Sequence, residues 1–475
     1  MPEFDLTARP WIPVLDGTDH RHVNIADALT HAHRLHLATT DPTERAVLLR
    51  LLAAVLEAAA GTDTTARWDA QWRSPVLDGA AITSYLERHR DAFDLFHPKR
   101  PFGQCALLTA ANRDSHALRA GSWSGTASTL FDWAQLGPAR PLAPAEAALA
   151  LLVLQGVHPG GIQSGHPGDP RTKGGKVYGS HPGLLSCATH VTVEPAGAPL
   201  KDLLLLMNPP GPRAAGDRPA WEQPPPAAAG REREPAGRLD LRTWPTRRVR
   251  LMPDGGGHVA ALALHDGDRT ADPGAAVRAA DPCAATSPSG ARFDLRGRDG
   301  RGRDRGFEAP WAAVLALPGG DRTAAAPVIA HLVDACERSA VAPETVLALR
   351  FHRVEHTTAH RAAISAVLAP LLPLGPAAHL ADPAVRDQLL AAARRAAALR
   401  HRIHKLAEDA RLPGGDRIDL AADPGVRTAW DLYLHDLDRP AFEAALDDAL
   451  RRRIARHLGA TPLTQAAAVH QLTTA

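Results

Sequence analysis

Lysine is scarce in this sequence, and an excess of charge of either sign is absent. Lys and Arg together number 54 and Asp and Glu 52, which gives a formal net charge of +2 at pH 7. This balance excludes a histone-like polycation, so any contact with nucleic acid must come from a local basic patch. The five lysines are Lys99, Lys173, Lys176, Lys201 and Lys405.

Cysteine is also rare, and the four cysteines are widely separated along the chain. No C-x-x-C pair exists, which removes the best sequence signature of a zinc site. Four thiols in a chain of 475 residues do not make a disulfide framework, so we expect them to be reduced and buried. They are Cys105, Cys187, Cys283 and Cys336.

Long apolar runs are missing as well. The longest, residues 147–154, falls well short of the roughly 20 residues that a membrane-spanning helix needs. The first residues lack a basic segment followed by an apolar one, so no secretory signal is expected. We therefore expect no membrane segment and a cytoplasmic location.

What the sequence does have is enough apolar residues for a sizeable core, 45% against 22% charged. Its length leaves room for two to four domains on a prior of about 100–200 residues each. Residues 4–17 predict a short strand that enters a turn at Asp16-Gly17, and Pro10 and Pro13 favour an edge position. The apolar spacing further predicts helices at 24–37, 43–59 and 145–155, strands at 188–193, 247–252 and 259–265, and a helix or strand at 200–207.

Residues 158–183 form a segment of a different kind, with eight glycines and three cations that face a single Asp169. Glycines let the backbone approach a groove closely, while Arg and Lys neutralise phosphate. The segment is therefore either a flexible surface loop or a loop built to lie against a ligand. Its fit to a nucleotide-binding phosphate loop is poor, because position 170 is proline and Val177 follows Lys176 where a hydroxyl is required.

After residue 362 the pattern predicts helices alone, at 362–372, 384–409, 425–436 and 441–458. Four helices joined by short loops indicate a helical bundle. The predicted class is thus α+β, with a large mixed α/β N-terminal domain at 1–360 and a C-terminal four-helix bundle at 361–475. Basic residues on the bundle helices form either a DNA-facing stripe or an ordinary solvated face. They are Arg394, Arg395, Arg402, Lys405, Arg452 and Arg453.

One string has the look of a catalytic motif, since His352, Glu355 and His356 fit the H-x-x-E-H pattern of inverted zinc peptidases. On a helix these histidines and His360 would share a face and could ligate a metal. The flanking Leu347, Leu349 and Phe351 instead alternate as in a strand. We keep a metallopeptidase as a rival hypothesis only, and we expect no catalytic residue, metal or cofactor.

Several strings, in their order along the chain, resemble a known family: the CasA-type large subunits of Cascade, the type I-E CRISPR surveillance complex. The resemblance covers most of residues 5–250 in sequence and the helical tail in pattern. The strings are PWIPV at 10–14, FDLFHPKRPF at 93–102, SGTASTLFD at 124–132, GGIQSG at 160–165, GDPRTKGGK at 168–176, LLLLMN at 203–208 and DRPAW at 217–221.

This resemblance implies a subunit without catalysis that recognises the protospacer-adjacent motif of double-stranded DNA and helps to open the duplex. It implies as partners a guide CRISPR RNA, the target DNA, the backbone, 5′-handle-binding and small Cascade subunits, and an effector helicase–nuclease or a variant nuclease. The guide's base pairing would supply sequence specificity, while a glycine loop would read the minor groove.

The resemblance also assigns roles to three loops of this chain. The DNA-contacting glycine loop corresponds to Gly160, Gly161, Arg171, Lys173 and Lys176. The loop that docks near the guide-RNA handle corresponds to Thr126, Ala127, Ser128, Thr129, Leu130 and Phe131. The wedge-position loop corresponds to Thr357, Thr358, Ala359, His360 and Arg361. No glutamine occurs between residues 355 and 361, where the family has one. An assembly scaffold with lost or altered motif recognition therefore stays open as an alternative.

Overall fold

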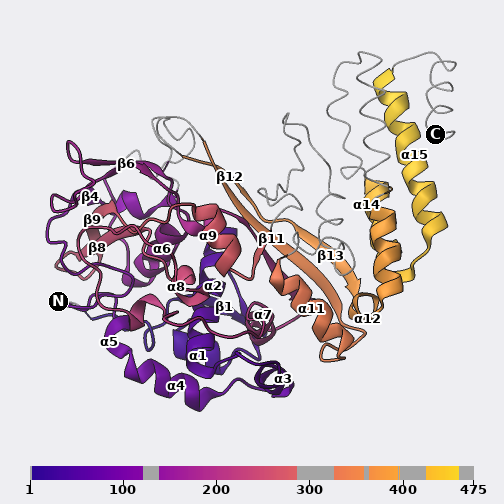
Figure 1. The fold of residues 1–475 in the computed structure, drawn as a ribbon, viewed down its shortest axis with the longest axis horizontal. Coiled ribbons are helices and arrows are strands. Elements are labelled where there is room, and N and C mark those ends of the chain that lie inside the picture. The colour runs from indigo at the N-terminus through magenta and orange to yellow at the C-terminus, as the bar shows by residue number, and fades with distance from the viewer. Residues whose placement is uncertain are drawn as a thin grey trace. The chain divides into compact units, whose positions relative to one another are not determined.

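The computed structural model describes residues 3–120, 123, 138–285, 326–357, 363–393, 395 and 424–458 (Figure 1). The chain divides into two compact units. The first consists of Met1–Ala285 and Arg350–Pro370, and the second of Thr286–Leu349 and Leu371–Ala475. Both helices and strands occur throughout, so the predicted mixed α/β class is confirmed.

The first unit carries most of the strands. Its helical elements are α1 (Ile25–Thr30), α2 (Pro42–Ala60), α3 (Thr65–Arg73), α4 (Gly79–Arg88), α5 (Arg90–Phe93), η1 (Ser115–Leu118), α6 (Pro144–Val157), η4 (Leu184–Ser186), α7 (Leu200–Leu206), η5 (Ala220–Glu222), α8 (Arg238–Arg242) and α9 (Pro273–Ala280). Its strands are β1 (Ile12–Asp16), β2 (Asp19–Val23), β3 (Leu35–Leu37), β4 (Arg113–Asp114), β5 (Gly161–Ser164), β6 (Lys176–Ser180), β7 (Thr189–Pro195), β8 (Arg247–Pro253), β9 (Val259–Asp266), β10 (Ala284–Ala285) and β12 (Ile364–Leu368). Strand β11 (Val346–His356) begins in the second unit and ends in the first.

The N-terminal strands form a three-stranded sheet in the order β2-β1-β3. The predicted turn at Asp16-Gly17 is confirmed, but the predicted edge position is wrong because β1 is the central strand. Pro13 precedes the first residue of β1 that pairs with β3, Val14, and its carbonyl accepts a hydrogen bond from the Ala38 N–H at 3.0 Å. The predicted helix at 24–37 is too long, since α1 ends at Thr30 and Leu35–Leu37 pairs with β1 instead.

Helix α2 confirms its prediction to within one residue at either end. The Asp41 carboxylate caps it by accepting the Thr43 N–H at 2.7 Å, and Pro42 occupies the first turn, where its missing N–H costs nothing. Residues 47–57 of the helix are all buried, which places α2 in the interior of the unit. It packs against α6, α4, α7 and α8.

Strands β4, β9 and β8 form a second antiparallel sheet, and the two predicted strands at 247–252 and 259–265 are confirmed as β8 and β9. Side-chain amides complete its hydrogen bonding where no strand is available. Gln104 accepts the Leu251 N–H at 2.8 Å, and Gln155 accepts the Arg247 N–H at 2.9 Å. These bonds tie the loop after α5 and the end of α6 to β8.

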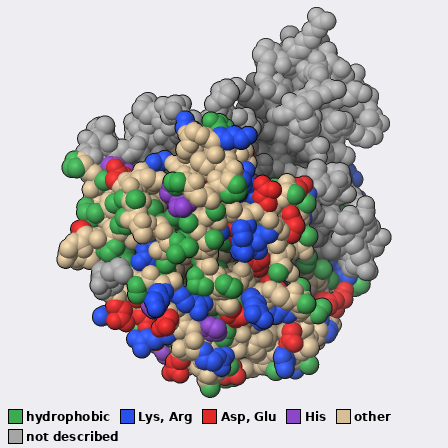
Figure 2. All heavy atoms as spheres, turned by 60° about the vertical axis from the view of Figure 1, so that its left-hand side comes forward, with side chains coloured by type: hydrophobic (Ala, Val, Ile, Leu, Met, Phe, Trp, Pro, Cys, Tyr) green, Lys and Arg blue, Asp and Glu red, His purple; other side chains and the backbone are tan. Residues whose placement is uncertain are grey.

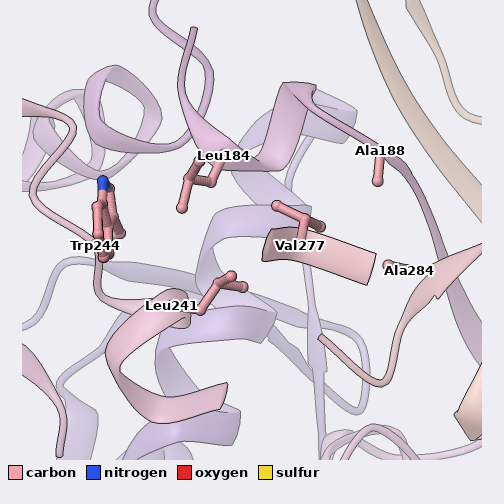
Figure 3. Close-up of a cluster of buried hydrophobic side chains, with 6 residues drawn as sticks. All are labelled: Leu184, Ala188, Leu241, Trp244, Val277 and Ala284. Atoms are coloured by element: carbon pink, nitrogen blue, oxygen red, sulfur yellow. The ribbon is translucent and has the colours of Figure 1, made fainter. Parts of the chain in front are cut away.

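A cluster of buried apolar side chains joins η4, α8, α9 and β10 (Figure 3). It links segments that are far apart in the sequence. Trp244 connects it to polar groups, because its indole N–H donates to the Asp268 carbonyl at 3.2 Å. The members of the cluster are Leu184, Ala188, Leu241, Trp244, Val277 and Ala284.

A third sheet has the strand order β10-β7-β11-β12. The predicted strand at 188–193 is confirmed as β7, and Arg350 of β11 binds Glu194 of β7 with two hydrogen bonds of 2.8 and 3.0 Å. The predicted helix at 362–372 is wrong, because Ile364–Leu368 pairs antiparallel with β11. Pro370 and Pro373 disfavour a helix in that window.

The second unit contains α11 (Pro327–Glu337), β13 (Leu371–Pro376), α12 (Ala377–Ala381), a helix over residues 383–393, α14 (Pro424–Asp436) and α15 (Arg439–Leu458). The predicted helices at 425–436 and 441–458 are confirmed as α14 and α15. Trp430 and Tyr433 of α14 pack against Phe442 of α15, with ring centroids 5.0 and 5.4 Å apart.

All four cysteines are free thiols, as predicted, although Cys187 is only half-buried. Among the residues that the structure describes, none of the helices combines the length and apolar character that crossing a membrane requires.

We predict that Leu241→Ala destabilises the first unit, because Leu241 is 1% exposed within the apolar cluster. The loss of transfer free energy and the remaining cavity should lower the free energy of unfolding by about 2–5 kcal/mol. Chemical denaturation measures this change. Leu107→Ala is the matched control, since Leu107 is 64% exposed and its truncation should change stability by no more than about 0.5 kcal/mol. Equal effects of both changes would contradict the role of the cluster.

Candidate nucleic-acid interface

The glycine-rich segment forms an antiparallel hairpin of β5 and β6, in which Gln163 pairs with Val177 and Ser164 with Lys176. The chain between the two strands ends in a tight turn that runs from Lys173 to Lys176. There Lys173 and Lys176 exchange two backbone hydrogen bonds of 2.8 and 3.1 Å. Gly174 and Gly175 between them have φ of +56° and +74°, as a two-residue type I′ turn requires.

Two cations lie on this turn and are open to solvent. Lys173 and Lys176 are exposed, and Gly174 and Gly175 between them are exposed as well. Within the described residues, neither lysine has a carboxylate at ion-pair distance. The tip of the hairpin therefore presents two uncompensated positive charges on a backbone without intervening side chains.

Arg171 is held differently from the two lysines. Its guanidinium donates to both carboxylate oxygens of Asp169, at 3.0 and 2.6 Å, and to the Gly267 carbonyl at 3.2 Å. A second carboxylate, Asp266, lies 3.4 Å from its Nη1. Burial raises the pKa of Asp169, but the hydrogen bonds and charge of Arg171 lower this pKa by a larger amount, so the net shift is downward. Arg171 thus anchors the hairpin to the loop after β9.

The base of the hairpin requires glycine for close packing. A Cβ on Gly160 would lie 2.5 Å from the Ser180 carbonyl oxygen and 2.9 Å from the Pro182 nitrogen. Both are backbone atoms that cannot move aside without breaking the pairing. Gly161 follows with a φ of +94°. These two predicted DNA-contacting residues therefore shape the hairpin from inside.

Two buried basic side chains, Arg247 and His158, lie at this base. The buried Arg247 side chain donates to the His158 ring at 3.2 Å and to the Pro159 carbonyl at 2.7 Å. Burial, the charge of Arg247 and, more weakly, that of His356 lower the pKa of His158 well below its usual value. Burial also lowers the pKa of Arg247 itself, to about 10.

Of the predicted wedge-position loop, only Thr357 belongs to the described residues. It is exposed, and it exchanges hydrogen bonds with Ala363, through its backbone N–H at 2.9 Å and its hydroxyl at 3.1 Å. The pairing of β11 with β12 therefore continues to this pair. Thr358, Ala359, His360 and Arg361 lie outside the described residues, as does the predicted docking loop from Thr126 to Phe131.

The predicted basic face of the second unit is only partly described. Arg395 forms an ion pair with Glu443 at 3.2 Å, and Arg452 pairs with Asp448 one helical turn away. Arg453 belongs to α15, but its side chain is outside the described part, as are Arg394, Arg402 and Lys405. The two described arginines are thus compensated by carboxylates of their own unit.

The H-x-x-E-H string lies on strand β11, which confirms the alternation of Leu347, Leu349 and Phe351 and contradicts the helix that a peptidase needs. Four residues of strand span about 13 Å. His352 and His356 are therefore much farther apart than two histidines one helical turn apart, which is the spacing that the peptidase motif needs. No group of potential ligands that could hold a metal occurs among the described residues.

Two arginines near the hairpin were not predicted from the sequence. Arg269 donates to the Tyr178 carbonyl at 3.0 Å and to the Ser180 hydroxyl at 2.8 Å, and Arg113 donates to the Ser164 hydroxyl at 2.8 Å. Both are remote from the glycine-rich segment along the chain, so no local pattern reveals them. On the face of the first unit in Figure 2, Lys and Arg side chains are interspersed with Asp and Glu, as the near-neutral composition requires.

Comparison with known proteins identifies the family of this chain. A family described as CRISPR-associated protein Cse1 matches residues 5–468. The chain belongs to the CRISPR-associated Cse1 family. The CasA/Cse1 protein of Thermus thermophilus is 36% identical over 268 residues, which are 54% of this chain and 50% of that relative. The chain thus matches about half the length of this curated relative.

Solved structures share the fold of this Cse1-family chain. Thermobifida fusca Cse1 superimposes with a TM-score of 0.80 at 22% identity, over 99% of this chain and 97% of that one. A chain of a structure described as a CRISPR RNA-guided surveillance complex gives a TM-score of 0.71 at 22% identity, over 100% and 99%. At this level of identity the likeness shows the fold alone. Membership of the Cse1 family confirms the resemblance that the ordered strings of the sequence indicate.

His352 supplies a prediction about pH. It is buried, and neither ring nitrogen has a hydrogen-bond partner among the described residues. Burial and, to a smaller extent, the charges of His190 and Arg50 lower its pKa to about 3. Below pH 6.5 the His352 side chain binds a proton in the unfolded chain but stays neutral in the folded chain. The free energy of unfolding therefore decreases as the pH falls from 6.5 towards 3. His352→Leu should remove this loss, worth about 1.4 kcal/mol by pH 5.5.

Denaturation curves at pH 7.5 and 5.5 test this expectation. His22→Gln is the control, because His22 is exposed and should leave the pH dependence unchanged. The expectation fails if the wild type and His352→Leu lose the same free energy of unfolding between the two pH values.

Proposed function

We propose that this chain is the non-catalytic large subunit of a CRISPR RNA-guided surveillance complex, and that it binds double-stranded target DNA through the tip of the β5–β6 hairpin. The observation that carries the proposal is the pair of exposed, uncompensated lysines, Lys173 and Lys176, on a glycine turn in a chain of the Cse1 family. A solved structure of the same fold, described as a CRISPR RNA-guided surveillance complex, supports the assembly.

The chemistry of the tip suits a duplex. Two ammonium groups neutralise backbone phosphates, and each phosphate contact releases condensed counterions. The exposed backbone of Gly174 and Gly175 enters a groove without steric hindrance. Minor-groove readout distinguishes little more than A·T from G·C pairs. Such a loop can therefore recognise a short motif but cannot specify a long target sequence. Pairing with a guide RNA supplies the remaining specificity.

The other loops take their proposed roles from the same family. Residues Thr126 to Phe131 dock near the guide-RNA handle, and Thr357 to Arg361 stand at the wedge position beside the opened duplex. The arginines of the helical unit contact the DNA backbone. The proposed partners are the guide CRISPR RNA, the target DNA, the backbone, 5′-handle-binding and small subunits, and a helicase–nuclease or a variant nuclease, all in the cytoplasm.

A second candidate is an assembly scaffold of a variant complex with lost or altered motif recognition. The absence of glutamine between residues 355 and 361 favours it. A scaffold forms the complex normally, but the complex then binds guide-matched duplexes equally whatever bases flank the match. Binding to duplexes with randomised flanking bases separates the two candidates.

We predict that Lys173→Ala/Lys176→Ala weakens duplex binding by the reconstituted complex. Each lost phosphate contact should reduce the slope of log affinity against log salt by roughly 0.9. Fluorescence anisotropy with a labelled, guide-matched duplex over a salt titration measures both quantities. The fold should survive, because both side chains are exposed.

Lys99→Ala provides a matched control, since Lys99 is an exposed lysine on a different segment of the first unit. It should leave the affinity and the salt slope at the wild-type values. If the double variant binds like wild type across the titration, the hairpin tip does not contact phosphate and the proposal is overturned.

A further inference from the structure

The hairpin carries two exposed apolar side chains in addition to its cations. Ile162 of β5 is 47% exposed and Tyr178 of β6 is 53% exposed. The register shifts between the pairs Gly161–Ser180 and Gln163–Val177, so that Tyr178 and Gly179 form a bulge in β6 opposite Ile162. Paired residues share a face of a sheet, and faces alternate along a strand. Val177 is buried on the inner face, so Ile162 and Tyr178 lie together on the outer one.

Tyr178 differs from the other two tyrosines of the chain. Tyr85 and Tyr433 are buried, and their hydroxyls donate to Glu222 at 2.6 Å and to the Gln388 carbonyl at 3.5 Å. Tyr178 is the one tyrosine that presents its ring to solvent. Lys176, two residues before it, shares its face of β6. The apolar pair therefore adjoins a cation that the proposed function already places on phosphate.

The backbone that carries the ring is firmly held. Arg269 binds the Tyr178 carbonyl and the Ser180 hydroxyl, and its Nε donates to Asp266 at 2.9 Å. On the other strand, Arg113 binds Ser164. The backbone position from which the Tyr178 ring projects is therefore fixed by these hydrogen bonds.

We propose that Ile162 and Tyr178 form an apolar wedge, separate from the wedge-position loop Thr357 to Arg361, that enters the duplex next to the phosphate-binding tip and unstacks a base step. This inference rests on the proposed function and specifies how that site begins to open DNA. Duplex-bending proteins insert apolar side chains between base steps from the minor groove, and exposed bases stack on aromatic rings. The positive tip argues for DNA as the occupant, because the adjoining cations match phosphate.

The test compares Ile162→Ala/Tyr178→Ala with wild type in the reconstituted complex on two guide-matched duplexes. One duplex is fully paired, and the other carries a short non-complementary bubble beside the flanking motif. A 2-aminopurine base at the first step of the match reports unstacking by its fluorescence. The wedge predicts about a tenfold loss of affinity or more on the paired duplex, with a matching loss of the 2-aminopurine signal. On the bubble duplex the variant should bind like wild type.

Two further variants sharpen the result. Tyr178→Phe keeps the ring and should retain the 2-aminopurine signal, whereas a role of the hydroxyl alone would abolish it. Val76→Ala removes an exposed apolar side chain elsewhere on the unit and should change nothing. Equal losses on both duplexes would make the pair a simple contact surface, and no loss on either would remove it from the interface. Both results overturn the wedge.

Failure of the wedge and failure of the proposed function give different results. If Lys173→Ala/Lys176→Ala weakens binding to both duplexes and reduces the salt slope while the wedge variant binds like wild type, only the wedge is wrong. If the lysine variant is also indistinguishable from wild type, the hairpin does not bind DNA and both proposals fall.

Discussion

Two buried carboxylates just after the middle of the chain hold the candidate interface in place. Asp266 closes β9 and receives Arg269 and Arg171, while Asp268, two residues on, receives Arg233 and Arg248. Burial raises the pKa of Asp268, but Arg248 and Arg233 lower it by more. Loss of Asp268 would leave the buried Arg248 guanidinium without its carboxylate, which typically costs about 3–5 kcal/mol. The hairpin, the β8–β9 sheet and the segment before α8 all depend on this pair.

Asp268 also connects the charged network to the apolar core through its backbone. The Asp268 carbonyl accepts the Trp244 indole N–H, and the Arg233 guanidinium stands 4.0 Å from the centre of that ring. Packing and ion pairing therefore support each other at one place. The arginines of this region serve the fold, and the lysines of the hairpin tip are left to act outside it. A nearly neutral chain can thus still present a local positive surface.

Local sequence signals predicted the elements whose causes are local. The cap at Asp41, Pro42 and the apolar spacing behind them located α2, and alternation located β7, β8 and β9. Predictions failed where a distant strand decided the outcome. The sequence predicts helices over Leu35–Leu37 and Ile364–Leu368. In the structure the first segment pairs with β1 and the second with β11. Pro370 already argued against that second helix.

The candidate site was predictable to a similar degree. Composition identified the glycine-rich segment and its lysines, because both are properties of a short stretch. Composition did not separate Arg171 from the lysines, since two of its three partners, Asp266 and Gly267, lie almost a hundred residues away. Arg113, Arg269 and the outward face of Tyr178 depend on the register of pairing, which only the folded chain supplies.

The preference of this chain for arginine makes its few primary amines informative. Among the described lysines, Lys201 is buried and donates to the Trp72 carbonyl at 3.0 Å, whereas Lys99, Lys173 and Lys176 are exposed. Among the lysine side chains of the first unit, an amine-reactive cross-linker or label would therefore attach almost entirely at Lys99 or at the type I′ turn. Cross-linking at Lys173 and Lys176 would therefore identify the molecule that binds at this turn.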